Sequence, residues 1–430
     1  MNQSFLIFGR EPSVSFAELY QYLGDTKENI ALAAPSGAII NDESLAKDAP
    51  FKLAGVIKSG VVAKTLDKLT AEALAEILQG FVKADGKLHF GISIYGLGKD
   101  RGGWDAKKLG LSVKTILKNA GRSVRLVESR SGNLSSVDVA KNKLLRTGAE
   151  LCIFVTPTGF LIGKTEAVQP FEDYSHRDYD RPGRDAKNGM LPPKLALAMV
   201  NMAVGQRARH AFPLQILDPF CGSGTVLQEA LLLGHQVIGT DIDEQAIKNS
   251  KMNLEWLFSR HPELVEGSHR QPVKSGDPST PLRSAQDDDA SRWRVEQVDV
   301  RNLSKILSPQ SVDAIVAEFD LGPPLQGGES VGKIDSIVFS LSDFYFDALR
   351  ALRPFLKPGG RVVVAWPHFR TQGVLVSTFS KLRDLGWSLV APYPLEFEKN
   401  FPLSERGTLL YGREGQHVGR EILILKKAGG

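Results

Sequence analysis

One stretch of the sequence decides the fold: Ile216-Leu217-Asp218-Pro219-Phe220-Cys221-Gly222-Ser223-Gly224-Thr225. It predicts a buried strand that ends at Asp218, a tight glycine turn and a helix over 226–233. Gly222 and Gly224 would let the backbone approach a ligand with no Cβ in the way. The amino end of the helix would direct free N–H groups and a partial positive charge at the same place. The turn is therefore expected to be part of a binding site.

A second strand follows this helix. The run Gln236-Val237-Ile238-Gly239-Thr240 is mostly apolar, and it ends at an acid, Asp241. An acid at the end of the second strand can accept hydrogen bonds from both hydroxyls of a ribose. The order strand, glycine turn, helix, strand and acid therefore predicts a cofactor that contains a nucleoside.

The composition sets the limits on protein class. The chain has 430 residues, enough for two or three domains, and its hydrophobic (42%) and charged (24%) fractions are ordinary for a globular protein. Its two cysteines, Cys152 and Cys221, form no metal-binding spacing and no disulfide framework, which favours a reducing cytoplasm. The first ten residues do not resemble a signal peptide, and no apolar run reaches the roughly 18 residues of a membrane helix. A membrane partner is not expected.

Positive charge gathers in one part of the first half. The net charge is only +4, but residues 99–146 contain twelve Lys and Arg against four Asp and Glu. A helix is expected over 106–119, and a solvated helix face would explain such a run equally well. Its place beside a nucleoside-cofactor domain favours contacts with the phosphates of a nucleic acid. The candidate residues are Lys107, Lys108, Lys114, Lys118, Arg122 and Arg125.

The first half is predicted to contain short strands and helices, and it has no glycine-rich phosphate loop. We therefore expect this half to recognise the substrate and not to catalyse the reaction. A strand over 4–10 precedes a helix over 13–23, for which Ser15 is the expected N-cap. Residues 171–193 are polar, aromatic and irregular in pattern, with many charges of both signs. They are expected to be a linker that also forms a wall of the site.

The second half alternates strands with helices. This order predicts an α/β fold with a mostly parallel sheet covered on both faces, and a late hairpin would make the sheet mixed. A helix is expected over 340–352. Residues 259–293 are polar, proline-bearing and aperiodic, so we expect a disordered insertion whose deletion leaves activity intact.

The type of cofactor follows from what the glycine turn lacks. A dinucleotide fingerprint needs a third glycine, and a P-loop needs Gly-Lys-Ser/Thr, and neither is present. The turn resembles the S-adenosylmethionine loop of Rossmann-like methyltransferases. The resemblance implies that Asp218 and the turn hold the methionine end, Asp241 the ribose, and Asp299 the adenine amine. It extends the candidate cofactor site to Phe220, Cys221, Gly222, Ser223, Gly224, Thr225, Ile242 and Val300.

The substrate is expected at the carboxyl end of the strand over 312–317, where open α/β sheets bind ligands. Enzymes that methylate exocyclic amines of nucleobases carry Asp/Asn-Pro-Pro-Tyr/Phe at this place, whereas this chain has Glu318-Phe319-Asp320-Leu321. We expect Glu318 to accept the amine hydrogens and Phe319 to stack on the base, with Leu321 at the aromatic position. Catalysis would then rest on alignment and exclusion of water.

A wider resemblance covers most of the chain. It rests on Phe8-Gly9-Arg10, Ile162-Gly163-Lys164-Thr165, Arg177-Asp178-Tyr179-Asp180-Arg181-Pro182 and Gly189-Met190-Leu191-Pro192-Pro193-Lys194. These segments resemble the THUMP-domain tRNA guanosine N2-methyltransferases that act on guanosine 10. The family implies S-adenosylmethionine as cofactor and tRNA as partner, with Met190, Leu191, Pro192 and Pro193 lining the methionine pocket. It also implies a ferredoxin-like region over 1–60, a THUMP-like RNA-binding domain over 61–168, a linker over 169–190 and a Rossmann-like methyltransferase domain over 191–428.

Two other functions stay open. One is methylation of another exocyclic amine, in DNA or rRNA. A non-catalytic RNA-binding protein that has kept the cofactor fold is the third reading, favoured by the departure at Glu318–Leu321. The sequence leaves open the exact nucleotide, the number of methyl groups and the need for a small activating protein subunit.

Overall fold

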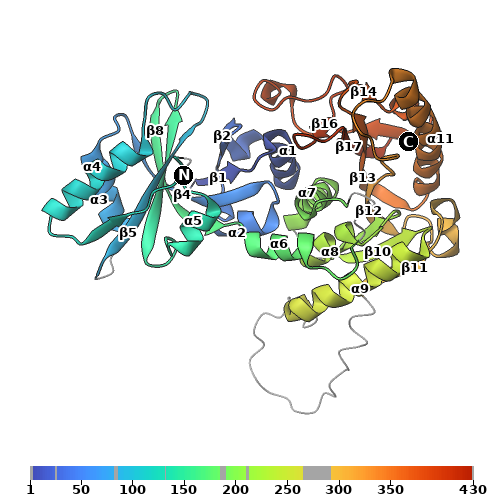
Figure 1. Cartoon of the computed structure of the whole chain (residues 1–430), viewed down its shortest axis with the longest axis horizontal. Coiled ribbons are helices and arrows are strands. Elements are labelled where there is room, and N and C mark those ends of the chain that lie inside the picture. Colours follow the sequence, from blue (N-terminus) through green and yellow to red (C-terminus); the bar gives the residue numbers. More distant parts are fainter. Residues whose placement is uncertain are drawn as a thin grey trace, which may run out of the picture. The chain divides into compact units, whose positions relative to one another are not determined.

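The computed structural model describes residues 3–24, 27–81, 86–130, 132–184, 190–209, 213–264 and 292–428. These residues form two compact units (Figure 1). The first unit comprises Met1–Asp173 together with Tyr393–Pro402. The second comprises Tyr174–Pro392 and Leu403–Gly430.

A single eight-stranded sheet forms the centre of the first unit, in the order β2-β3-β1-β4-β8-β7-β5-β6. Strand β5 runs parallel to β6 and β7, and the other neighbours are antiparallel. The expected boundary at residue 60 falls inside β4, so the division into two domains there stays a prediction. The strands are Ser4–Phe8 (β1), Ile30–Ala34 (β2), Gly37–Ile40 (β3), Val56–Leu66 (β4), Leu88–Gly96 (β5), Val124–Leu126 (β6), Gly148–Thr156 (β7) and Gly159–Val168 (β8).

Helices α3 and α4 pack against each other, and α4 also covers β5 and β6 (Figure 1). The expected helix over 106–119 is confirmed as α4. The expected N-cap Ser15 is wrong: α1 begins at Pro12 after Glu11, and the Ser15 hydroxyl donates to the Glu11 carbonyl from inside the helix. A proline is favoured in a first turn, which moves the start upstream. The helices are Pro12–Leu23 (α1), Leu45–Lys52 (α2), Ala71–Phe81 (α3), Ala106–Asn119 (α4) and Ser136–Lys141 (α5).

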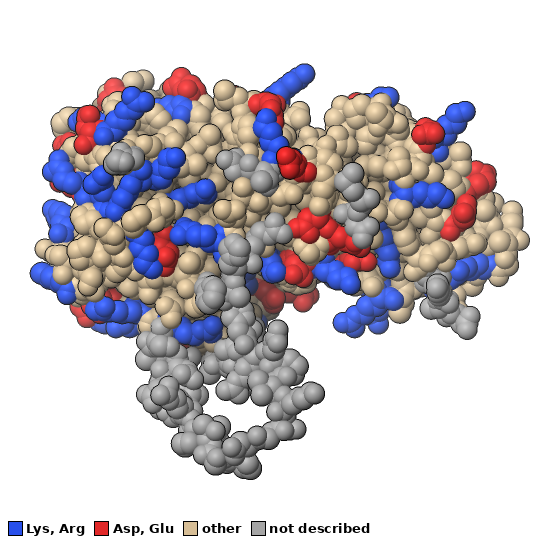
Figure 2. Space-filling view, turned by 180° about the vertical axis from the view of Figure 1, so that it is seen from behind, with Lys and Arg blue, Asp and Glu red and all other residues tan. Residues whose placement is uncertain are grey.

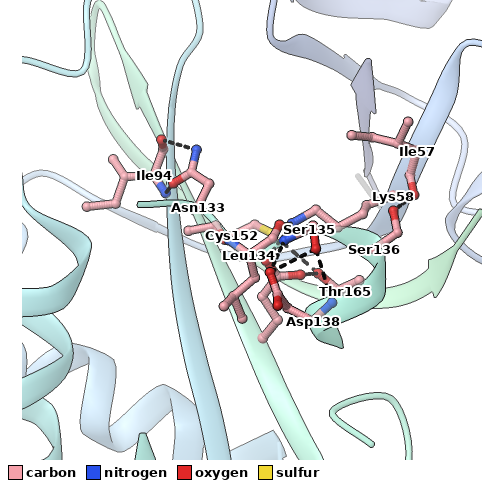
Figure 3. A network of polar contacts seen from close by, with 12 residues as sticks. Ile57, Lys58, Ile94, Asn133, Leu134, Ser135, Ser136, Asp138, Cys152 and Thr165 are labelled. Carbon is pink, nitrogen blue, oxygen red and sulfur yellow. Dashed lines mark hydrogen bonds and ion pairs between the residues drawn. The ribbon is translucent and has the colours of Figure 1, made fainter. Parts of the chain in front are cut away.

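A buried polar network ties the strands of this unit together (Figure 3). The Lys58 ammonium lies 2.5 Å from the Glu150 carboxylate and donates to the Leu134 carbonyl at 2.8 Å. Glu150 also accepts from the hydroxyls of Ser93 and Thr165, each at 2.6 Å. Burial alone would lower the pKa of Lys58, but the Glu150 charge raises it above its ordinary value. The pair is therefore ionised. Its members and their side-chain hydrogen-bond partners come from four strands that are neighbours in the sheet, β4, β8, β7 and β5.

A short segment from late in the chain belongs to the first unit. The ring of Phe401 stacks on Phe16 of α1, with centroids 4.1 Å apart. Phe397 and Tyr393 approach the same ring at 4.8 and 5.2 Å. Aromatic contacts of this kind add to the area that they bury. Tyr393–Pro402 is therefore a structural part of the first unit.

The second unit is built on a mixed sheet in the order β11-β10-β9-β12-β13-β17-β15, with β14 and β16 added at β13 and β17. The five neighbouring strands β11, β10, β9, β12 and β13 run parallel to one another, and β17 is antiparallel to β13. This arrangement confirms the expected α/β sheet. The chain order reverses between β9 and β12, which makes the switch point where such sheets bind ligands. The strands are Gln215–Asp218 (β9), Gln236–Asp241 (β10), Trp293–Gln297 (β11), Val312–Glu318 (β12), Leu356–Phe369 (β13), Val374–Leu375 (β14), Trp387–Leu389 (β15), Leu409–Tyr411 (β16) and Val418–Lys427 (β17).

The helices of this part depart from expectation in two places. The segment expected to be irregular forms a helix, α6, because the Arg177 guanidinium packs on the Tyr174 ring and pairs with the buried Glu229. Helix α11 begins nine residues before the expected start, since Ser330 caps it by accepting from Lys333 N. The helices are Phe171–Tyr179 (α6), Pro193–Val204 (α7), Thr225–Leu232 (α8), Glu244–Arg260 (α9) and Val331–Leu352 (α11).

Most of the expected insertion over 259–293 lies outside the described residues, which stop at residue 264 and resume at 292. Helix α9 runs on to Arg260, so the first residues of that range are helical.

Candidate active site

Four acids lie at one edge of the second sheet. Asp218, Asp241 and Glu318 end the parallel strands β9, β10 and β12, and Asp299 follows β11 by two residues. Carboxyl ends of parallel strands share an edge, so the sheet brings together acids that are 100 residues apart in the chain, such as Asp218 and Glu318. This edge at the switch point is the candidate active site.

The glycine turn is held by the second of these acids. The Asp241 carboxylate accepts from Gly222 N at 2.9 Å. Gly222 has a φ of 51°, and a Cβ added there would meet nothing within 4 Å, so its outer side is open. Gly224 has a φ of 81°, but a Cβ there would lie 2.9 Å from the Ser250 hydroxyl. Gly224 therefore serves close packing against α9, and Gly222 leaves room for a ligand.

Helix α9 supports the turn from behind, through residues that the sequence did not single out. The Ser250 hydroxyl donates to the Gly222 carbonyl at 2.9 Å, and the Asn253 amide donates to the Ser223 carbonyl at 2.8 Å. Cys221 is 5% exposed and packs beneath this contact, and burial raises the pKa of its thiol. Its side chain is therefore a packing group, and the turn offers a ligand its backbone.

A buried arginine joins the turn to the expected methionine pocket. Arg181 is 2% exposed, donates to the Thr225 hydroxyl at 2.6 Å and lies 3.1 Å from the Met190 sulfur. Leu191 is buried, and Pro193 begins α7. Met190, Leu191, Pro192 and Pro193 thus lie in one segment that Arg181 fixes to the start of α8. The sequence pattern marked Arg181 within a motif without giving it a role.

The first acid is buried among charges of its own sign. Burial raises the pKa of Asp218 well above its usual value, and the nearby Asp241 and Glu318 raise it further, while Phe220 N opposes them. Among the described residues, no Lys or Arg side chain pairs with Asp218 or Asp241. A cationic ligand would favour the charged form of these carboxyl groups and would lower the pKa of Asp218.

The three residues expected near the adenine differ in their exposure and in their partners. Ile242 is 67% exposed and leaves an apolar side chain beside Asp241. Val300 is buried in the core, so its side chain is not free to line a site. Both oxygens of Asp299 accept from the Arg301 guanidinium, which lowers the pKa of Asp299. An adenine amine would share this carboxylate with Arg301.

The expected catalytic acid has a partner from the far end of the chain. The Arg420 Nε lies 2.5 Å from Glu318 Oε1. Burial raises the pKa of Glu318, and Arg420 opposes that effect. No described residue donates to the second oxygen, Oε2, which leaves it able to accept a hydrogen bond.

The expected stacking ring is in the wrong place. Phe319 is 1% exposed and packs between Phe220 and Tyr345, at centroid distances of 5.1 Å each. A ring covered on this scale has no face for a nucleobase, and Leu321 is only half-buried and not aromatic. Phe344 of α11 is 37% exposed and contacts the Phe220 ring at 5.5 Å. Sequence spacing did not find Phe344, because it lies 26 residues beyond Glu318 on a helix that was expected to begin later.

Comparison with known proteins agrees with this geometry. Residues 181–372 match the UPF0020 family, described as an RMKL-like methyltransferase domain. The chain therefore carries a methyltransferase domain. Over 82 residues it is 45% identical to a tRNA (guanine(10)-N2)-dimethyltransferase of Methanothermobacter thermautotrophicus, covering 19% of this chain and 23% of that relative. Over 254 residues it is 24% identical to the enzyme of the same name from Methanocaldococcus jannaschii, covering 58% and 70%. The crystal structure of TrmN from Thermus thermophilus aligns over 99% of this chain and 100% of that one, with 17% identity and a TM-score of 0.49.

The match places the methyltransferase domain over Arg181, the glycine turn and the Glu318 segment together. Within the described residues, no group of three His, Cys, Asp or Glu side chains is arranged to hold a metal ion. No described helix has the length and apolar character to cross a membrane.

The candidate RNA-binding residues lie in the first unit, outside the methyltransferase domain. Lys107 is exposed and pairs with Glu128 at 3.4 Å, which reduces its share of the positive charge. The buried side of α4 consists of Gly110, Val113 and Leu117. Of the candidates, Lys108, Lys118 and Arg125 are exposed, and Lys114 and Arg122 are half-buried.

Proposed function

We propose that this chain transfers a methyl group from S-adenosylmethionine to the exocyclic N2 amine of a guanine in tRNA. The observation that carries the reaction is the position of Glu318, at the carboxyl end of β12 and next to Asp218 across the switch point. The matched methyltransferase domain and the names of the two relatives support the choice of reaction and substrate.

The acidic edge fits the charge of the cofactor. S-adenosylmethionine supplies an electrophilic methyl group on a positively charged sulfur. The ammonium and sulfonium groups would lie by Asp218, whose pKa is raised by burial and by neighbouring carboxylates. Asp241 would hold the ribose while it fixes Gly222, and the exposed Ile242 would cover one side of the adenine.

In the reaction, the lone pair of the guanine N2 forms a bond to the methyl carbon, and the electrons of the carbon–sulfur bond go to sulfur. The nitrogen then loses one of its protons, to the Glu318 carboxylate and from there to solvent. Glu318 Oε2 would accept a hydrogen bond from N2 and turn the lone pair toward the methyl group, while Arg420 opposes the effect of burial on the pKa of this carboxyl and so favours its ionised form. Little proton abstraction is needed before the transfer, so alignment is the main contribution of the protein.

The first unit would bind the tRNA. We assign this role to the exposed and half-buried cations from Lys107 to Arg125, which would contact phosphates without reading the sequence. The ferredoxin-like region over 1–60 and the THUMP-like domain over 61–168 are part of the same proposal, as are a cytoplasmic location and a small activating subunit. Unstacking of the target base would bring it to Glu318.

The test is methyl transfer to unmodified tRNA by the purified protein, followed by nucleoside analysis. We expect N2-methylguanosine, at a level well above that of E318A run in parallel. Label in another nucleoside would favour a different exocyclic amine. Binding of tRNA and cofactor with no transfer would favour the non-catalytic reading, and either result would overturn the proposal.

A further inference from the structure

An open hollow of about 600 Å³ lies at the end of the second sheet opposite the active site. Its floor is formed where β12 and β13 begin, by Gln310 and Pro354. Three cations line it, Arg350, Arg353 and Lys427, and among the lining residues Asp384 is the one acid. The hollow therefore carries a positive charge that the active site does not have.

The same charge continues around the hollow. The ring of Phe346 lies between two cations, with the Arg350 guanidinium 4.6 Å and the Lys381 ammonium 5.6 Å from its centroid. Arg383 is also exposed, next to Asp384. Lys and Arg are frequent on this unit in the space-filling view, at the left of Figure 2. We refer to Arg350, Arg353, Lys381, Arg383 and Lys427 as the basic hollow.

Helix capping explains only part of this cluster. Arg350 and Arg353 lie at the carboxyl end of α11, where cations are stabilised by the helix dipole. Lys427 lies on β17 and Lys381 on a short 3-10 helix, so neither is placed by α11. Burial and the nearby Arg353 lower the pKa of Lys427. Cations from three elements thus converge here, and among the described contacts Arg350 is the one that also pairs with an acid, the exposed Asp347 at 3.8 Å. An anionic ligand would offset the repulsion between Lys427 and Arg353.

The hollow is too far from the acids to take part in the transfer. Strand β12 separates them with seven residues, Val312–Glu318, a depth of about 20 Å at the usual rise of a strand. A folded RNA bound with one nucleotide at Glu318 extends well beyond that distance. An open surface lined by two guanidinium groups, a lysine and an aromatic ring suits the phosphates of a nucleic acid backbone.

We propose that the basic hollow binds backbone phosphates of the RNA substrate away from the target nucleotide. The identity of the RNA in this inference rests on the proposed function. The phosphate contact itself rests on the charge of the basic hollow. It adds a contact on the methyltransferase unit to those expected on the first unit. Phosphate contacts of this type position a substrate and make binding depend on salt.

The experiment is a titration of tRNA binding against KCl with the full-length chain, for the wild type and for R350E/R353E. Each lost phosphate contact lowers the slope of log Kd against log salt by roughly 0.7–0.9, so we expect the slope to fall by about 1.5 for two contacts. S-adenosylmethionine affinity should not change. R350Q/R353Q, with charge removed instead of reversed, should lower the slope by a similar amount and shows that the effect is not misfolding.

The matched control is K251E. Lys251 is an exposed lysine of α9, a helix that contacts α8, β10 and β11 and not the hollow. Its substitution should leave the slope unchanged. A wild-type slope in both arginine variants, or an equal fall in K251E, would overturn the inference. Binding with the expected slopes but no methyl transfer would instead overturn the proposed function alone.

Discussion

The carboxylate of Glu318 is paired with the Arg420 guanidinium, which reaches it from the antiparallel strand β17. The two side chains are 16% and 6% exposed. Glu318 ends β12 at the edge of the sheet where Asp218 ends β9. The pair therefore holds one carboxylate in place at this edge and leaves its second oxygen as an acceptor.

Replacing Glu318 by alanine should reduce methyl transfer without loss of cofactor binding. A hydrogen bond to a charged group contributes about 1.5–3 kcal/mol, which corresponds to a fall in kcat of roughly 10- to 150-fold. Single-turnover kinetics and calorimetry with S-adenosylmethionine would measure the two effects. D320A is the control, since the Asp320 carboxylate is exposed and accepts only from Gly322 N in the described contacts, and the bond from the Tyr345 hydroxyl goes to the main-chain carbonyl, which the substitution keeps. An E318A enzyme as fast as D320A would contradict the assigned role.

The acid limb of the pH–rate profile should depend on Arg420. Burial raises the pKa of Glu318 and Arg420 lowers it, and only the carboxylate accepts the amine hydrogen. Activity is therefore lost as pH falls through this pKa, which is raised from the ordinary value for Glu. Removing the guanidinium in R420Q should move the acid limb to higher pH, and R420K should move it less. An acid limb at the same pH in all three enzymes would show that another group titrates.

Asp241 and Asp243 form a matched pair for the cofactor site. Asp241 accepts from Gly222 N, whereas Asp243 caps α9 by accepting from Gln245 N at 2.8 Å. D241A should weaken S-adenosylmethionine binding by roughly 10- to 100-fold, because two hydroxyl contacts are lost along with support of the turn. D243A should cost about 1 kcal/mol in urea unfolding and leave the affinity unchanged. Equal affinities in the two variants would remove Asp241 from the site.

Phe344 should replace Phe319 as the aromatic surface for the base. Stacking of a base on an aromatic ring contributes about 1–3 kcal/mol, so F344A should lower kcat/KM for tRNA by roughly 5- to 150-fold. F344Y should retain most activity. Phe339 lies on the same helix and is 71% exposed, yet no described ring contact joins it to the turn. F339A should behave as wild type, and a similar loss in both would point to helix stability instead.

The Lys58–Glu150 pair should be important for the stability of the first unit. Removing one member of a buried ion pair leaves an uncompensated charge and costs about 3–5 kcal/mol, as expected for K58M. The exposed Lys52–Asp48 pair, at 2.9 Å, gives the comparison, and K52M should change the unfolding free energy by less than about 0.5 kcal/mol. Urea unfolding followed by near-UV circular dichroism measures both. Equal stabilities would mean that Lys58 is solvated in solution.

The sequence predicted the strand, turn and helix that begin at the Asp218 strand because local rules govern them. A strand that ends in an acid, a turn that needs positive φ and a capped helix each leave a mark within a few residues, as at Asp218 and Asp243. The alternation of strands and helices then determined the parallel order. The burial of the Val300 side chain was not predicted, because the side of the chain that faces the core cannot be read from its neighbour Asp299.

The substrate end was harder to predict because its contacts are long-range. Alignment with a motif placed Phe319 as a stacking ring, but burial between Phe220 and Tyr345 depends on α11, which packs from elsewhere. Arg420 lies 102 residues beyond Glu318, on a strand whose register no local pattern specifies. The same limit applies to Arg181, whose role depends on the start of α8.

The segment Tyr393–Pro402 makes the two units inseparable by a single cut. A fragment that stops at residue 173 would lack the ring that stacks on Phe16, and the remainder would carry an aromatic peptide with nothing to cover it. Both halves would then present apolar surface to solvent and tend to aggregate. Expression of the first unit alone therefore requires that residues 393–402 be supplied as well, by fusion or as a separate peptide.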